Sequence, residues 1–406
     1  MASIRRLVLV LGLMSCAITS AFGQASTMSK GSFDFNTNGI VFQTADSANR
    51  VIMRFRMQNW ATYVTESETD LSAAYTDLVV RRLRLRFGGN LLDPRLTFNI
   101  QLSFSRSDQD FNDTEFANIV RDAMVFWNFN ENLQVGFGQT KLPGNRQRVI
   151  SSADLEFPDR SIVNGAFNLD RDFGLQGFWR PLSGPFVVNL RGAVSSGDGR
   201  NQNPIEGGGF AYTGRVEVLP FGQFQNGGDY FESDLQREPT PKVSIGLSAQ
   251  HNEAMNRTRG ELGKELYAQR TADVVYGDAL LKWMGLSFYT EWAQRTAADP
   301  ITYDPDDSSS TRAVFVGHGY MFQTTYTFPF HLMLGLRFAT TEAEDALQGT
   351  SDYKRIQHLS GVITYFFNRH RIKSNIEFGE ISTTDLSTPD ITAHNLFARL
   401  NVELGI

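Results

Sequence analysis

The sequence predicts an all-β fold, namely a transmembrane antiparallel β-barrel of about 16 strands. Runs of alternating apolar and polar residues indicate strands, because successive side chains of a strand point to opposite faces. Short and long connections alternate between these runs, as in barrels with short periplasmic turns and long outer loops. The last run, 392–406, is amphipathic: Leu400 and Leu404 alternate with Arg399 and Glu403, which is typical of a barrel-closing strand.

The N-terminus is expected to be an export signal over residues 1–23. Arg5 and Arg6 precede an apolar stretch, and Ala21-Phe22-Gly23 fits the small-x-small pattern of a cleavage site. Cys16 lies inside this signal and is the only cysteine, so the mature chain is expected to contain no disulfide and no thiolate metal site. Lipidation of Cys16, in place of its removal with the signal, stays open as an alternative.

The charge of the mature chain excludes one class of partner. Loss of Arg5 and Arg6 leaves 36 basic residues against 44 acidic ones, a formal charge of −8. Such an acidic chain is not expected to bind nucleic acid. We expect residues 24–50 to form an N-terminal periplasmic segment and residues 51–406 to form the transmembrane barrel.

Sixteen strands are expected from the alternation of apolar and polar residues. The clearest pattern flanks a turn near Asn90: Leu83 and Leu85 alternate with arginines before it, and Phe98 and Ile100 alternate with polar residues after it. A short helix is expected only at 261–269. The strands are expected at residues 51–64, 77–89, 95–105, 119–128, 133–140, 172–180, 185–195, 210–219, 242–252, 273–283, 286–296, 313–326, 331–340, 355–367, 372–378 and 392–406.

The connections alternate in length, with one exception. The short ones are 90–94, 129–132, 181–184, 284–285, 327–330 and 368–371, and the long ones include 65–76, 106–118, 196–209, 253–271, 297–312, 341–354 and 379–391. Segment 220–241 is the exception, because it is long where a short turn is expected. An even number of strands leaves both ends of the barrel domain on the periplasmic side.

The connection 141–171 is expected to be a third outer loop that constricts the pore. It is too long for an ordinary hairpin loop, and it is basic near its start, at Lys141, Arg146 and Arg148. Its apolar residues, such as Phe157 and Phe167, indicate that it packs against something rather than lying in solvent.

Arginines dominate the side chains expected to face the lumen. If apolar residues face lipid, where an arginine or lysine costs about 2–4 kcal/mol at the midplane, the opposite parity faces inward. The same rule turns acidic residues inward as well, so the lumen is expected to be mixed in charge with a basic stripe. The basic residues are Arg54, Arg56, Arg82, Arg84, Arg86, Arg191, Arg215, Arg337, Lys373 and Arg399, and the acidic ones are Glu217, Glu291, Glu377 and Glu403.

Two interpretations of this basic stripe stay open. Guanidinium groups fit phosphate oxygens and favour anions, so the stripe predicts an anion-selective pore. Alternatively, the arginines pair with loop carboxylates such as Asp154 or Glu156 and hold the loop in place. The residues expected to line the pore and bind anions are Arg54, Arg56, Arg82, Arg84, Arg86, Lys141, Arg146, Arg148 and Arg337.

Catalytic and metal-binding motifs are absent from the sequence. It contains no GxSxG, HExxH, P-loop or GxGxxG motif at a strand–helix junction. The six histidines are scattered, and none has the spacing of metal ligands. The sequence therefore predicts neither an enzyme nor a cofactor.

Several segments resemble the phosphate-selective porin O and P family of outer-membrane porins. They are the Arg81–Leu85 run with the glycine pair and hairpin after it, and residues 121–143, 157–161, 171–177, 212–222 and 361–378, in the family's order. The resemblance implies a sixteen-stranded barrel, commonly trimeric, that passes small anions such as phosphate along a basic ladder, with the third outer loop in the pore. It matches Arg82, Arg84 and Arg86 to the basic strand and Lys141 to the lysine that opens the loop. Gly144 stands where the family often has an aromatic residue.

The sequence is thus interpreted as an outer-membrane porin of a Gram-negative bacterium. It is expected to be a passive channel for small hydrophilic solutes that prefers anions such as phosphate, and to form a homotrimer in the outer-membrane lipid. Two alternatives stay open: an outer-membrane β-barrel enzyme acting on lipid, and an exported soluble β-protein that binds glycans.

Overall fold

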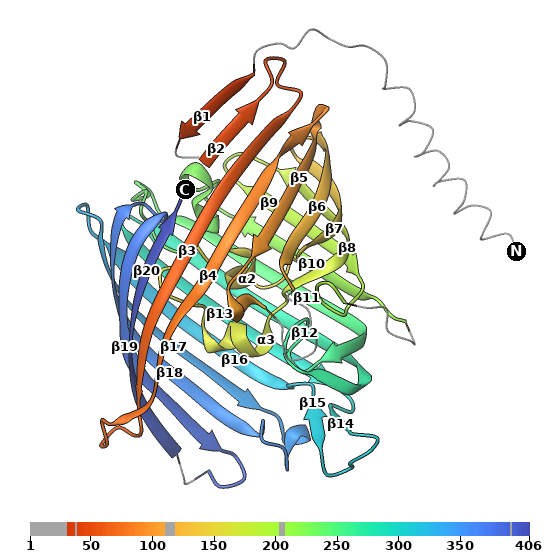
Figure 1. Ribbon diagram of the computed structural model, residues 1–406, viewed down its shortest axis with the longest axis vertical. Helices are drawn as coiled ribbons and strands as arrows, with labels where there is room; N and C mark the ends of the chain where they lie inside the picture. Colours follow the sequence, from red (N-terminus) through yellow and green to blue (C-terminus); the bar gives the residue numbers. More distant parts are fainter. Residues whose placement is uncertain (1–30, 37–38, 110–117, 203–207, 390–391) are drawn as a thin grey trace, which may run out of the picture.

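The chain folds into a closed barrel of sixteen antiparallel strands (Figure 1). The computed structural model describes residues 31–36, 39–109, 118–202, 208–389 and 392–406. The barrel strands are β3 (Arg50–Thr65), β4 (Ala73–Leu91), β5 (Asp93–Ser103), β6 (Val120–Asn130), β7 (Leu133–Lys141), β8 (Arg171–Leu182), β9 (Val187–Ser195), β10 (Ala211–Leu219), β11 (Lys242–Arg257), β12 (Glu265–Trp283), β13 (Leu286–Ala297), β16 (Gly317–Thr327), β17 (Leu332–Ala343), β18 (Lys354–Asn368), β19 (Ile372–Asp385) and β20 (Thr392–Gly405).

Each barrel strand pairs with its neighbours in the chain, and the last strand pairs with the first. The closing pair runs from Phe397 opposite Val64 to Gly405 opposite Arg56. Closure leaves no unpaired edge between these sixteen strands, which is the condition for a β-structure to cross a bilayer. The expected barrel is confirmed, and an open sandwich is excluded.

All sixteen expected strands are present, and several are longer than expected. The helix expected at 261–269 is wrong, because β12 begins at Glu265 and pairs there with Arg257 of β11. Likewise β19 continues to Asp385, beyond the expected end at 378. Paired backbones continue past the expected ends because the hydrogen-bonded ladder, unlike the apolar pattern, does not require a lipid-facing side.

Two hairpins were not expected. In segment 24–50, β1 (Ser32–Asn36) pairs with β2 (Gly39–Gln43), and β2 pairs with residues 50–53 of β3. The hairpin of β14 (Ile301–Tyr303) and β15 (Thr311–Ala313) lies in the connection between β13 and β16. The predicted signal, residues 1–23, lies outside the described residues.

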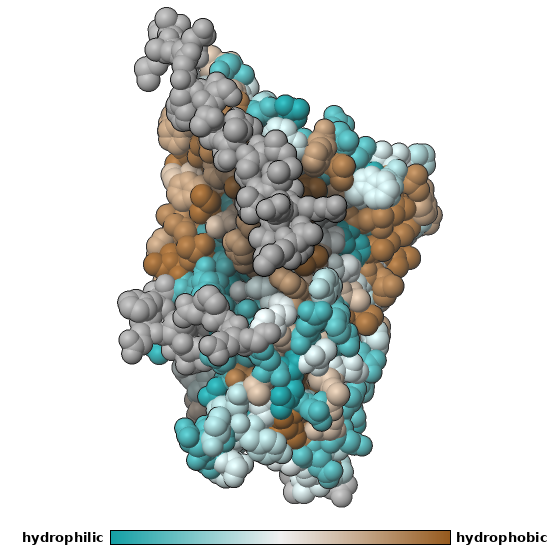
Figure 2. Space-filling model, turned by 90° about the vertical axis from the view of Figure 1, so that its right-hand side faces the viewer, coloured by the Kyte–Doolittle hydropathy of each residue, from teal (hydrophilic) through white to brown (hydrophobic). Residues whose placement is uncertain are grey.

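The two faces of the barrel wall differ as the alternation predicts. Large apolar side chains such as Phe137, Leu247 and Leu336 are exposed on the outside, whereas charged side chains such as Arg215 and Glu291 are buried inside. Figure 2 shows apolar residues on the side walls and hydrophilic residues over the end that carries the long loops. Among the residues that the structure describes, no helix has the length and apolar character needed to cross a bilayer.

The few helices lie in the connections. The connection between β7 and β8 contains α2 (Arg146–Val149) and α3 (Ile162–Phe167), and the segment between β10 and β11 contains η2 (Gln225–Tyr230). Two further short turns, η1 (Arg106–Asp108) and η3 (Asp345–Leu347), lie in other long connections.

One wall of the barrel has an apolar inner face. Inward side chains of β12, β13, β16 and β17, including Tyr276, Tyr289 and Met321, form a buried cluster with Val163 and Phe167 of α3. The Phe167 ring also lies 5.4 Å from the ring of Phe315, centroid to centroid. The barrel interior on this side is therefore a packed core rather than open space.

Candidate pore and its basic wall

The basic residues of β3 and β4 lie side by side on the inner face. Arg54 is opposite Arg86, Arg56 is opposite Arg84, and Gln58 is opposite Arg82. Opposite residues of an antiparallel pair have Cβ atoms about 4.5–5.5 Å apart, so these side chains form one continuous patch. We call Arg54, Arg56, Arg82, Arg84 and Arg86 the basic wall. These five arginines belong to the basic stripe that the sequence predicts on the inner face.

A β-bulge adds a sixth arginine that the alternation did not predict. Gln58 pairs with Arg82 and Asn59 with Val80, so Arg81 is an extra residue in β4. Its Nη2 donates to Asp159 Oδ2 at 3.0 Å, and Arg82 Nη2 donates to the other oxygen of the same carboxylate at 2.8 Å. Because the bulge breaks the alternation, two consecutive arginines both reach into the lumen.

A second bulge does the same on β6. Gln101 pairs with Asp122 and Leu102 with Val120, which makes Arg121 the extra residue. Arg121 and Asp122 are both buried, and Arg121 Nη1 lies 3.2 Å from Asp108 Oδ1. One signal in the sequence could have revealed both sites: two adjacent charged residues inside an amphipathic strand would place one charge in lipid unless a bulge intervenes.

The connection between β7 and β8 lies inside the barrel, and we call residues 142–170 the lumen loop. On one side Arg146 Nε donates to Asp278 Oδ1 of β12 at 2.6 Å. On the other side Lys373 Nζ of β19 donates to the carbonyl oxygens of Ala153 and Leu155, at 2.7 and 2.8 Å. The loop thus contacts well-separated strands of the barrel wall, and Figure 1 shows α2 and α3 within the ring of strands.

The basic wall is tied to carboxylates of the lumen loop, of the connection after β5 and of β20. Arg56 pairs with Glu403 at 2.6 Å, Arg84 pairs with Asp108 at 2.5 Å, and Arg82 pairs with Asp159. The carboxylate of Glu156 instead accepts from Gln323 and Thr325 of β16. The path of the lumen loop directs the Glu156 side chain toward β16 rather than β4. The position of Glu156 in the sequence does not predict this direction.

The remaining predicted pore residues hold the lumen loop. Lys141 Nζ donates to the carbonyls of Val149 and Ile150, and Arg148 pairs with Asp170. Arg146 and Arg337 are buried; Arg337 pairs with Glu377 at 3.0 Å and donates to the carbonyl of Asp159. Among the described residues Lys141, Arg146 and Arg337 line neither of the two main cavities of the lumen.

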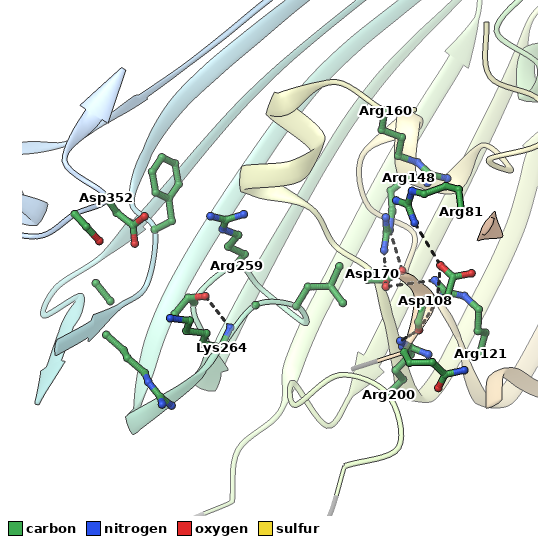
Figure 3. Close-up of a pocket in the computed structure, with 18 of the residues that line it drawn as sticks. Arg81, Asp108, Arg121, Arg148, Arg160, Asp170, Arg200, Arg259, Lys264 and Asp352 are labelled. Carbon is green, nitrogen blue, oxygen red and sulfur yellow. Dashed lines mark hydrogen bonds and ion pairs between the residues drawn. The ribbon is translucent and has the colours of Figure 1, made fainter. Parts of the chain in front are cut away.

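Two cavities lie along the basic wall. The outer cavity, of about 540 Å³, extends toward the long connections at Arg312 and Asp352, and its lining contains ten arginines and lysines against three aspartates. Figure 3 shows Arg121, Arg148 and Arg200 of this cavity grouped around Asp108 and Asp170. Arg121 and Arg200 are not among the pore residues expected from the sequence.

The inner cavity, of about 590 Å³, extends toward the short turn at Arg369 and Arg371. Arg54, Arg56 and Arg86 of the basic wall line it. Arg84 lines both cavities, so it marks the boundary between them. The lumen loop meets the wall at this boundary: Ser152 Oγ accepts from Arg56 Nη1 at 2.6 Å and from Arg84 Nη1 at 3.1 Å.

One group of side chains resembles a hydrolase site in composition but not in geometry. Ser382, His394 and Glu380 lie together on the outer face of β19 and β20. Both the Ser382 hydroxyl and the Glu380 carboxylate approach the same ring nitrogen, Nδ1 of His394. A proton relay needs the two oxygens on opposite nitrogens, so this set cannot activate a serine as it stands.

The same histidine belongs to a possible cation site. Ligand atoms of Glu68, Glu380 and His394 lie within 4.8 Å of one another, which makes this set a possible metal ligand group among the described residues. It is partly exposed and stands outside the lumen, away from the basic wall.

Comparison with known proteins supports the sequence interpretation. Residues 53–219, which extend from β3 to β10, match the family described as phosphate-selective porin O and P. The matched region is less than half of the chain. It contains the basic wall, both bulges and the lumen loop. No curated protein matches the sequence of this porin.

Solved outer-membrane channels share the fold of the whole porin. The DcaP channel of Acinetobacter baumannii aligns over 90% of this chain and 99% of its own, with a TM-score of 0.54 and 13% identity. An anion-selective porin from Comamonas acidovorans aligns over 88% and 99%, with a TM-score of 0.54 and 12% identity. OmpF of Salmonella typhi, in complex with daunomycin, aligns over 90% and 100%, with a TM-score of 0.55 and 13% identity. The family and fold thus indicate an outer-membrane channel.

Proposed function

We propose that this porin is a passive diffusion channel with a preference for small anions such as phosphate. The observation that carries the proposal is the unequal charge of the outer cavity, where ten basic side chains oppose three acidic ones. Fields of neighbouring guanidinium groups overlap within a Debye length of about 8 Å in physiological salt. A low-dielectric wall then focuses this positive potential into the lumen and raises the local concentration of anions.

The path of the anion follows the basic wall in this proposal. Arg84 borders both cavities, so a solute that moves from one cavity to the other passes its guanidinium. The opposite side of the lumen is filled by the apolar cluster around Phe167. The lumen loop therefore acts as the constriction, and its Ser152 contacts Arg56 and Arg84 at the narrow point.

Ion pairs along the path reduce the positive charge that acts on a passing anion. We therefore expect a moderate preference for anions. Asp108, Asp159 and Glu403 each neutralise part of the charge of an arginine that lines a cavity. Conduction requires binding that is weak enough for release, and a partly compensated ladder meets this requirement better than a bare one.

No catalytic or cofactor role is part of the proposal. The Ser382, His394 and Glu380 set lacks the geometry of a relay, so it does not favour a lipid-hydrolysing enzyme. As for assembly, we propose a homotrimer in the outer membrane of a Gram-negative bacterium; the OmpT protein of Vibrio cholerae, with a TM-score of 0.51 to this chain, is described in a trimer form.

Reversal potentials in a salt gradient test the proposed selectivity. The purified porin is placed in a planar bilayer with KCl at two concentrations, and the zero-current potential is measured. We expect the sign that corresponds to chloride permeating faster than potassium, and a decrease in conductance when phosphate is added, because phosphate dwells longer at the arginines. A cation-selective wild-type pore contradicts the proposal.

A further inference from the structure

Residues 220–241, the long segment where a short turn was expected, fold into the barrel. We propose that this segment, which we call the inner segment, supports the lumen loop from the periplasmic side, and that Glu232 is the positioning residue. The inference rests on the proposed role of the lumen loop as the constriction. It explains why this one connection breaks the alternation of short and long loops.

The inner segment is anchored inside the barrel by a buried lysine. Lys282 Nζ of β12 donates to the carbonyl oxygens of Gly228, Phe231 and Ser233, at 2.6, 2.8 and 2.9 Å. Lys282 is 1% exposed, so these three hydrogen bonds form out of contact with bulk water. The hydroxyl of Ser287 on β13 adds a fourth contact, to the carbonyl of Glu232, at 2.6 Å. The segment is therefore fixed to the wall of the barrel.

Glu232 then joins this anchored segment to the lumen loop. Its backbone N–H donates to the carbonyl of Asp154 at 3.0 Å. Its carboxylate accepts from the backbone N–H of Glu156 at 2.9 Å and from Gln147 Nε2 at 3.1 Å. Glu232 is fully buried, and its carboxylate also accepts from Gln323 Nε2 of β16 at 3.1 Å. One side chain thus satisfies donors at two separate points of the loop.

A second contact also joins the inner segment to the lumen loop. The carbonyl of Asp229, also in the inner segment, accepts from Arg146 Nη1 of the lumen loop at 2.9 Å. The inner segment therefore contacts the loop near both Arg146 and Glu156. Ser152, which meets Arg56 and Arg84 of the basic wall, lies between these two points in the chain. Fixing both points restricts how far Ser152 can move from the wall.

The function follows from this geometry. The width of the passage at Arg84 depends on the position of the lumen loop. The inner segment, which enters from the other end of the barrel, holds the loop in that position. Loss of the Glu232 carboxylate leaves the backbone N–H of Glu156 and the side-chain amide of Gln147 without this acceptor. The lumen loop is then held less firmly in one position. The expected result is a pore that is wider on average and fluctuates more.

The test compares single-channel records of the full-length porin with those of Glu232→Ala. We expect a higher conductance and more open-channel current noise in Glu232→Ala, in the same direction as deletion of residues 145–167 but smaller. Glu232→Gln keeps one acceptor oxygen, so it should restore most of the wild-type behaviour. If Glu232→Ala does not fold, Gln147→Ala removes the Gln147–Glu232 contact from the side of the loop and replaces it in the test, with a smaller expected effect.

Asp172→Ala is the matched control. Asp172 is also fully buried, but its carboxylate accepts from Ser196 Oγ and the backbone N–H of Gly197, both at 2.6 Å, rather than from the lumen loop. Wild-type conductance and noise in Glu232→Ala, or an equal change in Asp172→Ala, overturn the inference. If deletion of 145–167 also leaves conductance unchanged in a folded barrel, the proposed constriction itself is wrong, which is a separate failure.

Discussion

Arg82 and Arg86 lie four residues apart on the same face of β4, yet their surroundings differ. Arg82 is 2% exposed and shares the Asp159 carboxylate with Arg81. Arg86 is exposed in the inner cavity, and its Nε donates to Asn99 Oδ1 at 2.6 Å. The sequence pattern gives both residues the same role, whereas their contacts assign Arg82 mainly to holding the lumen loop and Arg86 to the electrostatics of the cavity.

This difference predicts opposite phenotypes for two identical substitutions. Arg86→Gln should move the reversal potential toward cation preference and change the free energy of unfolding by no more than about 0.5 kcal/mol, as surface substitutions do. Arg82→Gln should lower the stability by about 1–3 kcal/mol, because it removes a buried charged hydrogen bond. The measurements are reversal potentials and the temperature at which the folded band is lost on a gel.

Arg86→Lys serves as the control, because it keeps the charge and should keep the selectivity. An Arg86→Gln pore with the wild-type reversal potential would show that this part of the wall does not act on passing ions.

Among the elements, α3 depends on the barrel wall that it contacts. It has six residues, which is too short for a stable isolated helix, so its stability comes from packing. The Ser161 side chain accepts from the backbone N–H of Asn164 and caps the first turn. Phe167 at its end is fully buried, and the hydroxyl of Tyr276 on β12 donates to its carbonyl.

Phe167→Ala should therefore loosen the lumen loop. Removing a fully buried phenylalanine costs about 3–5 kcal/mol, and here the cost falls on the packing between α3 and the barrel wall. We expect a lower unfolding temperature together with a higher conductance. Phe173→Ala is the control, because Phe173 lies on the outer face of β8, where its ring contacts Phe137 at 5.1 Å. A conductance change of equal size in both variants would rule out a specific role of the α3 contact.

At the scale of the whole molecule, the net charge of the chain and the charge of the outer cavity are opposite in sign. The chain is acidic overall, with a formal charge of −6, yet the outer cavity is basic. Net charge alone would predict a repulsive field for anions, but fields from charges farther away than a Debye length are largely screened in salt. On the proposed function, the local charge of the cavity therefore matters more to a passing anion than the net charge of the chain.

The proposed assembly gives a prediction at this scale. The sixteen strands form a closed ring through β20 and β3, so association through the barrel wall involves outer side chains rather than strand exchange. We expect the porin, extracted in a mild detergent, to have the mass of three chains and to separate into monomers on heating before the barrel unfolds. A single-chain mass in several mild detergents, together with the absence of cross-linked products in intact outer membranes, would contradict the homotrimer.

The sequence by itself determined the barrel. Period-two alternation, set against a lipid environment in which charges are costly, determines which side of each strand faces inward. It placed Arg54 and Arg56 beside Arg84 and Arg86, because an antiparallel pair joined by one connection can only be aligned in a few registers. Both properties depend on residues that are close together in the sequence, so the sequence pattern is sufficient to predict them.

Only the tertiary structure decided which charges are available to a passing ion. The bulges at Arg81 and Arg121 each turn an extra charge inward, and one inserted residue has no periodic signature beyond the adjacent charges themselves. The apolar inner wall around Tyr276 could not be predicted from the sequence pattern. Inward side chains that pack on the lumen loop are apolar, and so are outward side chains that face lipid, so the pattern does not distinguish them. The contact between Glu232 and Glu156 joins segments that are 76 residues apart. Such contacts depend on how the lumen loop and the inner segment pack together inside the barrel. The pattern of residues within either connection does not predict this packing.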